Sequence, residues 1–192
     1  MAVGPTATVF VANGYDEESC GSSGDVRVYA KGESTVSYII CDSGIGQPFS
    51  QVNGVAVDRH GDVYVTWENA RYTTGRIREF TPGRHYKGHF LPPVLQWPYG
   101  IAIDSANNVI VTRDSPAAVD IFAPGGRTLL HSFANEGDPL FVTLDASQQH
   151  LYVTDALANK IDVYAYATQL LIDSAAFPGA QLDGVALSPA AR

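Results

Sequence analysis

An internal repeat constrains the fold more than any other feature of this sequence. Three segments share a short apolar strand, a polar turn and an alternating second strand: GVAVDRHGDVYVTW, GIAIDSANNVIVTR and FVTLDASQQHLYVTD. The last apolar residue of the first strand recurs at spacings of 46, 41 and 43 residues, at Val57, Ile103, Leu144 and Leu187. The N-terminal stretch AVGPTATVFVAN fits the same template through Val3. A constant period of this length is typical of proteins that repeat one small sheet.

The rest of each copy predicts two more strands. A third strand is expected at 26–32, 76–83, 119–126 and 161–168, and a looser fourth segment follows each one. Apolar and polar residues alternate in them, which indicates half-buried strands, and no segment keeps the 3.6-residue period of a helix. The pattern predicts an all-β protein, a β-propeller of four-stranded antiparallel blades, with four repeats plus one extra C-terminal strand.

The repeats also predict the domain organisation. Residues 1–192 are expected to form a single β-propeller domain with repeats at about 1–52, 53–98, 99–139 and 140–181, then a closing strand at 182–189. That strand and the N-terminal AVGP are both candidates to pair with TVFVAN. Three arrangements stay open: a four-bladed ring within one chain, an eight-bladed ring from two chains, and part of a longer propeller. A monomer and self-assembly through 182–189 are therefore both expected possibilities.

One repeat carries a family resemblance. LYVTDALANKIDVY at 151–164 resembles an NHL repeat, with Asp155, Asn159, Lys160 and Ile161 at the marked positions. LYVTD is also similar to the YVTN family of bacterial propellers. The resemblance extends repeat by repeat over the whole chain, although ENARYTTG is inserted in the second repeat and RDSPAA replaces the Asp and Asn pattern in the third. It implies a bacterial propeller, and its motifs specify blades rather than a reaction.

Charge and hydropathy argue against two classes of partner, nucleic acids and membranes. The chain has 20 acidic and 12 basic residues and a formal net charge of −8, which argues against nucleic acid as a partner. No apolar run approaches the ~20 residues that cross a bilayer, so no membrane partner is expected. The segment MAVGPTATVFVANG lacks a basic start and a long apolar core, so it is not a signal peptide.

Function is expected at one end of the blades. The loops from second to third strands and the links between blades emerge on the same side, which we call the top face, and loops on rigid scaffolds commonly carry function. This face is predicted to be acidic with aromatic patches. Its candidate ligand-binding residues are Trp97, Tyr99, Phe141, Trp67 and Arg113. The leading hypothesis is a binding or scaffold module that takes a small molecule or a protein there.

The alternative hypothesis is an enzyme that uses a metal. Ca²⁺ or another divalent cation prefers carboxylate and amide oxygens, and the candidate ligands are Asn13, Asn53, Asp155, Asp183, Glu18 and Glu68. Regucalcin-type lactonases and related phosphotriesterases, which are propellers, place a metal at the channel mouth. By analogy with them, the alternative function is a hydrolase of lactones, esters or phosphotriesters with unassigned catalytic residues, and more weakly a lyase. For each residue the competing interpretation is a turn cap, above all for Asp155.

The two cysteines are predicted to meet. Cys20 lies in the long top loop of the first repeat, and Cys41 lies at the end of its fourth strand. Because the third and fourth strands pair, both residues are expected at the same edge, where a disulfide is geometrically reasonable. Two free thiols are the alternative. A disulfide would favour an extracytoplasmic location, secreted or periplasmic.

Overall fold

Every regular element in the part of the chain that the structure describes is a β-strand. The structure is a computed structural model. It describes residues 1–14, 20, 24–41, 51–68, 75–82, 85–90, 96–125, 128–180, 182, 184, 185 and 187, with backbone only at 89, 90 and 96. The strands form four four-stranded antiparallel sheets, each from consecutive strands, which we call blades 1 to 4. The predicted all-β propeller class is confirmed. No helix in the described ranges is long and apolar enough to cross a membrane.

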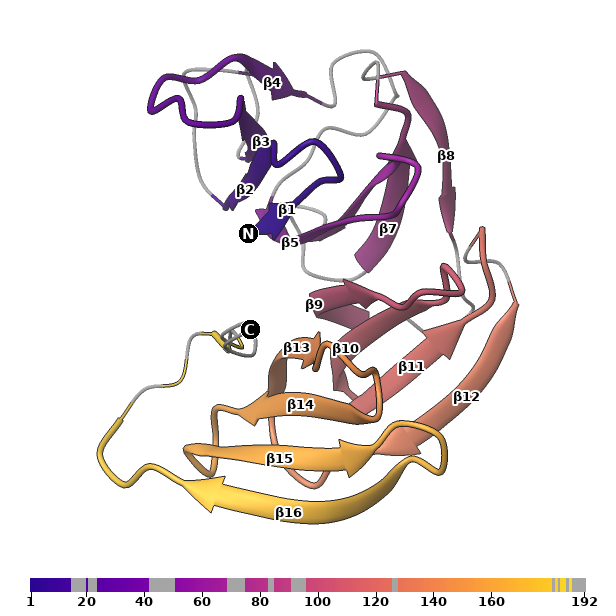
Figure 1. The fold of residues 1–192 in the computed structure, drawn as a ribbon. Helices are drawn as coiled ribbons and strands as arrows, with labels where there is room; N and C mark the ends of the chain where they lie inside the picture. Colours follow the sequence, from indigo (N-terminus) through magenta and orange to yellow (C-terminus); the bar gives the residue numbers. More distant parts are fainter. Residues whose placement is uncertain are drawn as a thin grey trace. The chain divides into compact units, whose positions relative to one another are not determined.

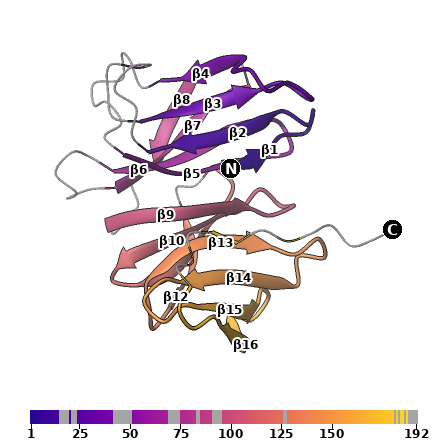
Figure 2. The same cartoon turned by 90° about the vertical axis from the view of Figure 1, so that its left-hand side faces the viewer.

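The first compact unit, Met1–Pro98, holds blades 1 and 2 (Figure 1). Blade 1 consists of β1 (Ala2–Val3), β2 (Val9–Asn13), β3 (Asp25–Tyr29) and β4 (Tyr38–Ile40). Blade 2 consists of β5 (Gln51–Val57), β6 (Val63–Glu68), β7 (Gly75–Phe80) and β8 (Tyr86–Phe90). Figure 2 shows β1 to β4 side by side.

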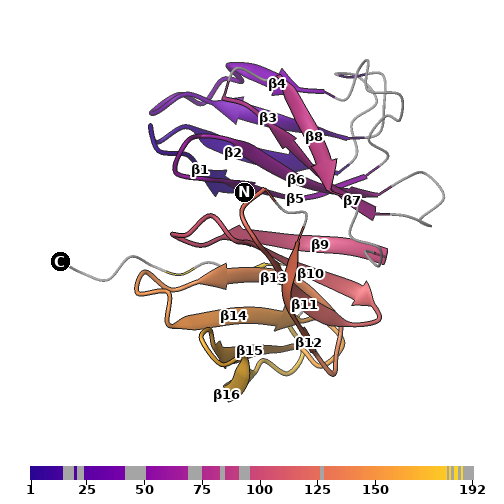
Figure 3. The ribbon, with the colours of Figure 1, turned by 90° about the vertical axis from the view of Figure 1, so that its right-hand side faces the viewer.

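The second compact unit, Tyr99–Arg192, holds blade 4 and most of blade 3. Blade 3 consists of β9 (Gln96–Ile103), β10 (Val109–Ser115), β11 (Ala118–Phe122) and β12 (Leu129–Ala134). Blade 4 consists of β13 (Pro139–Leu144), β14 (His150–Asp155), β15 (Lys160–Ala165) and β16 (Leu170–Ala176), in that spatial order (Figure 3).

Each unit has a core between its two blades. In the first unit Val28, Val65 and Trp67 are fully buried and belong to one apolar cluster. In the second unit Ile110 and Val153 belong to the corresponding cluster. The alternation read from the sequence has this cause, since one blade cannot bury both of its faces and needs a neighbour.

The first turn of every blade has the same backbone geometry. It starts at Gly4, Asp58, Asp104 and Asp145, and each of these accepts a hydrogen bond from the amide three residues later at 3.0 Å. That later residue has a positive φ in all four turns: Ala7 at 59°, Gly61 at 84°, Asn107 at 65° and Gln148 at 56°. The four turns can therefore be compared residue by residue.

The carboxylate that opens three of these turns is a cap. Asp104 Oδ1 accepts from the amides of Ala106 at 2.9 Å and Asn108 at 2.7 Å, and Asp58 Oδ1 makes the matching pair of bonds in blade 2. Blade 1 has Gly4 at this position and so lacks the cap. The sequence pattern of Asp after the first strand thus has a local physical reason.

The strand beside TVFVAN comes from the N-terminus. β1 pairs Ala2 with Phe10 and Val3 with Val9. Of the predicted closing strand at 182–189, residues 182, 184, 185 and 187 are described and none of them lies in a strand. The other four positions lie outside the described residues.

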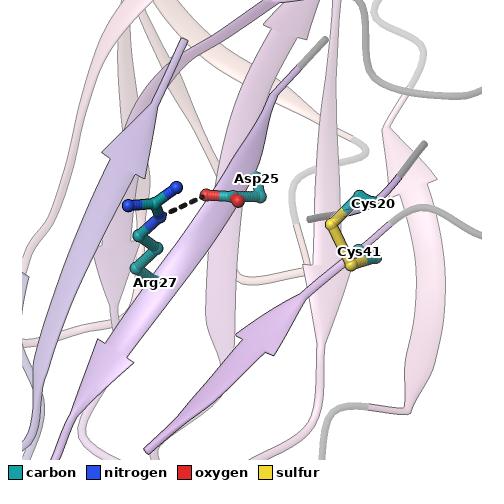
Figure 4. The surroundings of a disulfide bond; sticks show 4 residues. All are labelled: Cys20, Asp25, Arg27 and Cys41. Atoms are coloured by element: carbon teal, nitrogen blue, oxygen red, sulfur yellow. Dashed lines mark ion pairs between the residues drawn. A yellow bond between two sulfur atoms is a disulfide. The ribbon is translucent and has the colours of Figure 1, made fainter. Parts of the chain in front are cut away.

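A disulfide joins Cys20 and Cys41 with a Cα–Cα distance of 5.5 Å (Figure 4). It ties the loop after β2 to the end of β4, as the sequence analysis anticipated. Nearby on β3, the fully buried Asp25 faces Arg27, whose Nε lies 3.6 Å from Asp25 Oδ1. The disulfide and this ion pair both hold the top end of blade 1.

Candidate functional site

The top-face residue Trp67 lies in the core of the first unit. Its side chain is 0% exposed, and the Arg78 guanidinium carbon stands 4.2 Å from the centre of its ring. Burial lowers the pKa of Arg78 to about 10. The indole packs against a buried cation rather than presenting a face to a ligand.

Asn53 and Glu68 are brought together, as two candidate ligands of one metal would be. The Asn53 amide nitrogen donates to Glu68 Oε1 at 2.9 Å and to the Pro98 carbonyl at 2.8 Å. Glu68 is only 2% exposed. This pair links two blade edges within the first unit and gives both side chains a structural role.

Arg113 and Asp155 are also engaged in their own blades. Arg113 Nε donates to Asp120 Oδ2 at 2.7 Å, and its Nη1 donates to the Pro116 carbonyl. Asp155 Oδ1 accepts from the amides of Asp138 at 3.1 Å and Ala158 at 3.0 Å, so it caps the loops around it. These contacts match the turn-cap interpretation of Asp155.

Gly137 shows how tightly the Asp155 carboxylate is enclosed. A Cβ at residue 137 would lie 1.9 Å from Asp155 Oδ2, so only glycine fits. Burial, followed by the charges of Asp114 and Asp155, raises the pKa of Asp138. The charges of Asp114 and Asp155 therefore act on Asp138 at this end of the second unit.

The described side chains give little support to the predicted metal site. No group of three or more His, Cys, Asp or Glu residues within those ranges is arranged to hold an ion. Asn13 is half-buried at the end of β2, and Glu18 and Asp183 lie outside the described residues. Of the remaining aromatic candidates, Trp97, Tyr99 and Phe141 are half-buried, and Trp97 has a positive φ of 57°.

A pocket lies at the other end of blades 1 and 2, which we call the turn face. Its volume is about 380 Å³, in the range of small-molecule sites. The residues that line it come from the turns at the ends of β1, β3, β5 and β7 and from the strands beside them: Gly4, Pro5, Thr6, Thr8, Phe10, Ala30, Ser37, Tyr38, Val57, Arg59, His60, Gly61 and Pro82.

The second unit has side chains at the corresponding position. The Tyr166 hydroxyl of blade 4 donates to Asp104 Oδ2 of blade 3 at 2.9 Å. Burial and this hydrogen bond raise the pKa of Tyr166, and its ring packs against the apolar cluster of the unit. A second bond joins the two turns, from the Ser105 amide to Gln148 Oε1 at 2.9 Å.

Neither bond is possible in the first unit. Strand register and turn geometry align Gly4 with Asp104 and Pro82 with Tyr166. They align Pro5 with Ser105 and Gly61 with Gln148. Glycine has no acceptor side chain, proline has no amide hydrogen, and proline cannot reach as tyrosine does. All four replacements line the pocket, so their combination leaves it open.

Polar groups stand around a largely apolar floor. Phe10, Val57 and Pro82 supply apolar surface, and the hydroxyls of Thr6 and Thr8 lie 2.9 Å apart at the rim. Arg59 Nε lies 3.2 Å from His60 Nε2 on the same rim. The described lining thus offers an apolar cavity with hydrogen-bonding groups and the permanent positive charge of Arg59.

The repeat pattern predicted function on the top face and did not predict this pocket. A signal was present, because three repeats open the first turn with Asp and the first repeat has GP at residues 4–5. The same stretch nevertheless fits the repeat template through Val3. The partners Tyr166 and Gln148 come from another repeat, so their loss is visible only once two blades are packed together.

The comparisons with known proteins support the fold. No protein-family profile matches the chain, and neither does any curated protein. A protein of unknown function from Bacteroides caccae is 14% identical, with a TM-score of 0.61 over 94% of this chain and 62% of its own. A nidogen/laminin complex is 16% identical, with a TM-score of 0.70 over 83% and 59%. Hydrazine synthase from Kuenenia stuttgartiensis is 17% identical, with a TM-score of 0.67 over 90% and 47%.

In each case the chain spans less than two thirds of the matched structure. Likeness at this level of identity carries the fold and nothing finer. It agrees with the four-stranded blades and does not single out the NHL or YVTN family. The chain is a β-propeller with a pocket on the turn face of its first unit.

Proposed function

We propose that this protein is a binding module and that its ligand is a small molecule held in the turn-face pocket of the first unit. The observation that carries the proposal is the pocket itself, about 380 Å³ in volume, at a position that Tyr166 and Asp104 occupy in the second unit. A space that side chains fill in the second unit and leave open in the first is well placed to take a ligand.

The state of the top face supports the same choice. Trp67, Glu68 and Asp155 are at most 2% exposed, and each is held by contacts within its own unit. Releasing them for a ligand would break buried polar contacts, each costing about 1–3 kcal/mol. The pocket requires no such rearrangement. The disulfide supports placing this module outside the cytoplasm.

The test is to map where small molecules bind. A mixed library of neutral, acidic and basic fragments is titrated into the ¹⁵N-labelled protein, and amide shifts are recorded. We expect shifts confined to residues 4–8, 58–61 and 30–38 for at least one fragment. Pro82→Tyr places an aromatic ring where Tyr166 stands in the other unit, and it should abolish those shifts. Pro124→Tyr, the same turn position in blade 3, should leave them unchanged.

Two results would contradict the proposal. Shifts clustered at Tyr99, Phe141 and Arg113 would move the site to the top face, where the sequence analysis first expected a partner. Turnover of lactone or phosphotriester substrates that disappears when a chelator is added would favour the hydrolase. No observation on the described residues favours the hydrolase at present.

A further inference from the structure

We propose that the turn-face pocket selects small, largely apolar ligands that carry a carboxylate, with Arg59 binding the anionic group. This inference rests on the proposed function and adds the chemical class of the ligand. It follows from the charge of the pocket, its size and the composition of its floor.

The charge differs in sign from that of the matching position in the second unit. There, blade 3 contributes the Asp104 carboxylate, and the blade 4 residue equivalent to Arg59 is the uncharged Ala146. In the first unit Gly4 removes the carboxylate and Arg59 adds a guanidinium. The position therefore changes from one negative charge to one positive charge, in a chain whose net charge is −8.

Among the described residues, no carboxylate lines the pocket. The nearest acid in the sequence, Asp58, is 5% exposed, and its Oδ1 accepts from the amides of His60 at 2.8 Å and Asp62 at 2.9 Å. It is committed to its own turn. A carboxylate ligand would meet Arg59 and the rim hydroxyls without an acid in the lining to repel it, and guanidinium binds carboxylate in a planar, two-point geometry.

Size and floor define the rest of the ligand. A volume of about 380 Å³ corresponds to about a dozen non-hydrogen atoms, taking roughly 30 Å³ for each water-sized volume. The ring of Phe10 and the flat faces of Pro5 and Pro82 suit an aryl or short alkyl body. The class is thus an arylalkyl or alkyl monocarboxylate of this size.

The experiment compares three probes of nearly equal shape: 3-phenylpropionate, 3-phenylpropanamide and 3-phenylpropylamine. Dissociation constants are measured by shift titration on the full chain. We expect the carboxylate to bind about tenfold more tightly than the amide, with the amine weakest, and the preference to fall as salt is raised. Arg59→Gln should bring the acid and the amide to equal affinity.

Controls separate this inference from the proposed function. Lys31→Gln removes an exposed cation of blade 1 outside the lining and should leave the tenfold preference intact. Equal affinity of acid and amide in the natural chain, or an unchanged preference in Arg59→Gln, overturns the inference. If neutral probes still shift residues 4–8 and 58–61, the proposed function stands without it. If no probe shifts these residues, both fail.

Discussion

The two units are built on one scheme and differ in how their blades are joined. In the second unit, side chains cross from blade to blade: Tyr166 to Asp104 and Gln148 to the Ser105 amide. In the first unit the same positions are glycine or proline, and a pocket takes their place. The blades of the first unit therefore pack together without the side-chain bridges that join the turn face of the second unit.

The centres of the blades differ in charge as well. At the middle of the third strand, opposite a valine of the second, the first unit has Arg27 and Arg78 and the second has Asp120 and Asp162. Three of these charges have an oppositely charged side chain nearby, with Lys160 beside Asp162, whereas Arg78 lies over the Trp67 ring. Asp25 lies beside Arg27, and Arg113 donates to Asp120. What the blade requires at this position is compensation of a buried charge rather than a particular sign.

Loss of the disulfide should have the largest effect on the difference between the units, since only the first unit has one. Replacing Cys20 and Cys41 together by serine releases a link across 21 residues. The expected loss in the free energy of unfolding is about 3 kcal/mol, measured by urea denaturation. Hydrogen exchange should rise mainly in Met1–Pro98. A loss of hydrogen-exchange protection spread equally over both units would show that the disulfide does not act locally.

Removing the Tyr166–Asp104 bridge should make the second unit resemble the first, which has no such bridge. Tyr166→Phe keeps the ring and deletes the hydroxyl that donates to Asp104, which is 7% exposed. We expect a loss of roughly 2 kcal/mol in unfolding free energy, because the acceptor is a buried charge. Tyr152→Phe is the control, as its hydroxyl makes no hydrogen bond among the described residues. Equal losses in unfolding free energy for the two changes would show that the Tyr166–Asp104 hydrogen bond does not stabilise the unit.

The uncapped turn of blade 1 predicts a stabilising change. Ala7 has a φ of 59°, a left-handed conformation that glycine adopts without steric cost. Ala7→Gly should raise stability by about 0.5–1 kcal/mol after the larger chain entropy of glycine is subtracted. Ala146→Gly, in the corresponding turn of blade 4 at negative φ, should lower stability instead. The midpoint of thermal unfolding distinguishes the two directions.

The cap of blade 4 should respond to pH. Burial opposes ionisation of Asp145, but hydrogen bonds from His150, Ser147 and backbone amides lower its pKa from 3.8 to about 2. A lowered pKa in the folded state means that the cap stabilises above about pH 4 and that this contribution is lost as pH falls towards 2. Asp145→Ala should therefore lower the melting temperature at pH 7, by an amount that shrinks below pH 4. A constant difference at all pH values would assign the effect to packing.

Much of this architecture could be predicted from the sequence. The period of 41–46 residues and the alternation along each strand predicted four-stranded blades, because a strand with one buried face must alternate. The Cys20–Cys41 link was also anticipated from the pairing of two neighbouring strands. The burial of the top-face candidates could not be predicted from the sequence. The sequence places Trp67 at the end of the second strand of its repeat. Only the packed structure shows that its ring lies under the Arg78 guanidinium.

The residue pattern alone is sufficient to predict the strands, the Asp-capped turns and the repeat that arranges them into blades. These depend on residues close together in the chain. The pocket was decided by tertiary structure, because it depends on Gly4, Pro5, Gly61 and Pro82 acting together across two blades. Each of the four is an ordinary turn residue in its own repeat. Only when the blades are packed does the absence of two bridging side chains become a cavity, with Arg59 at its rim.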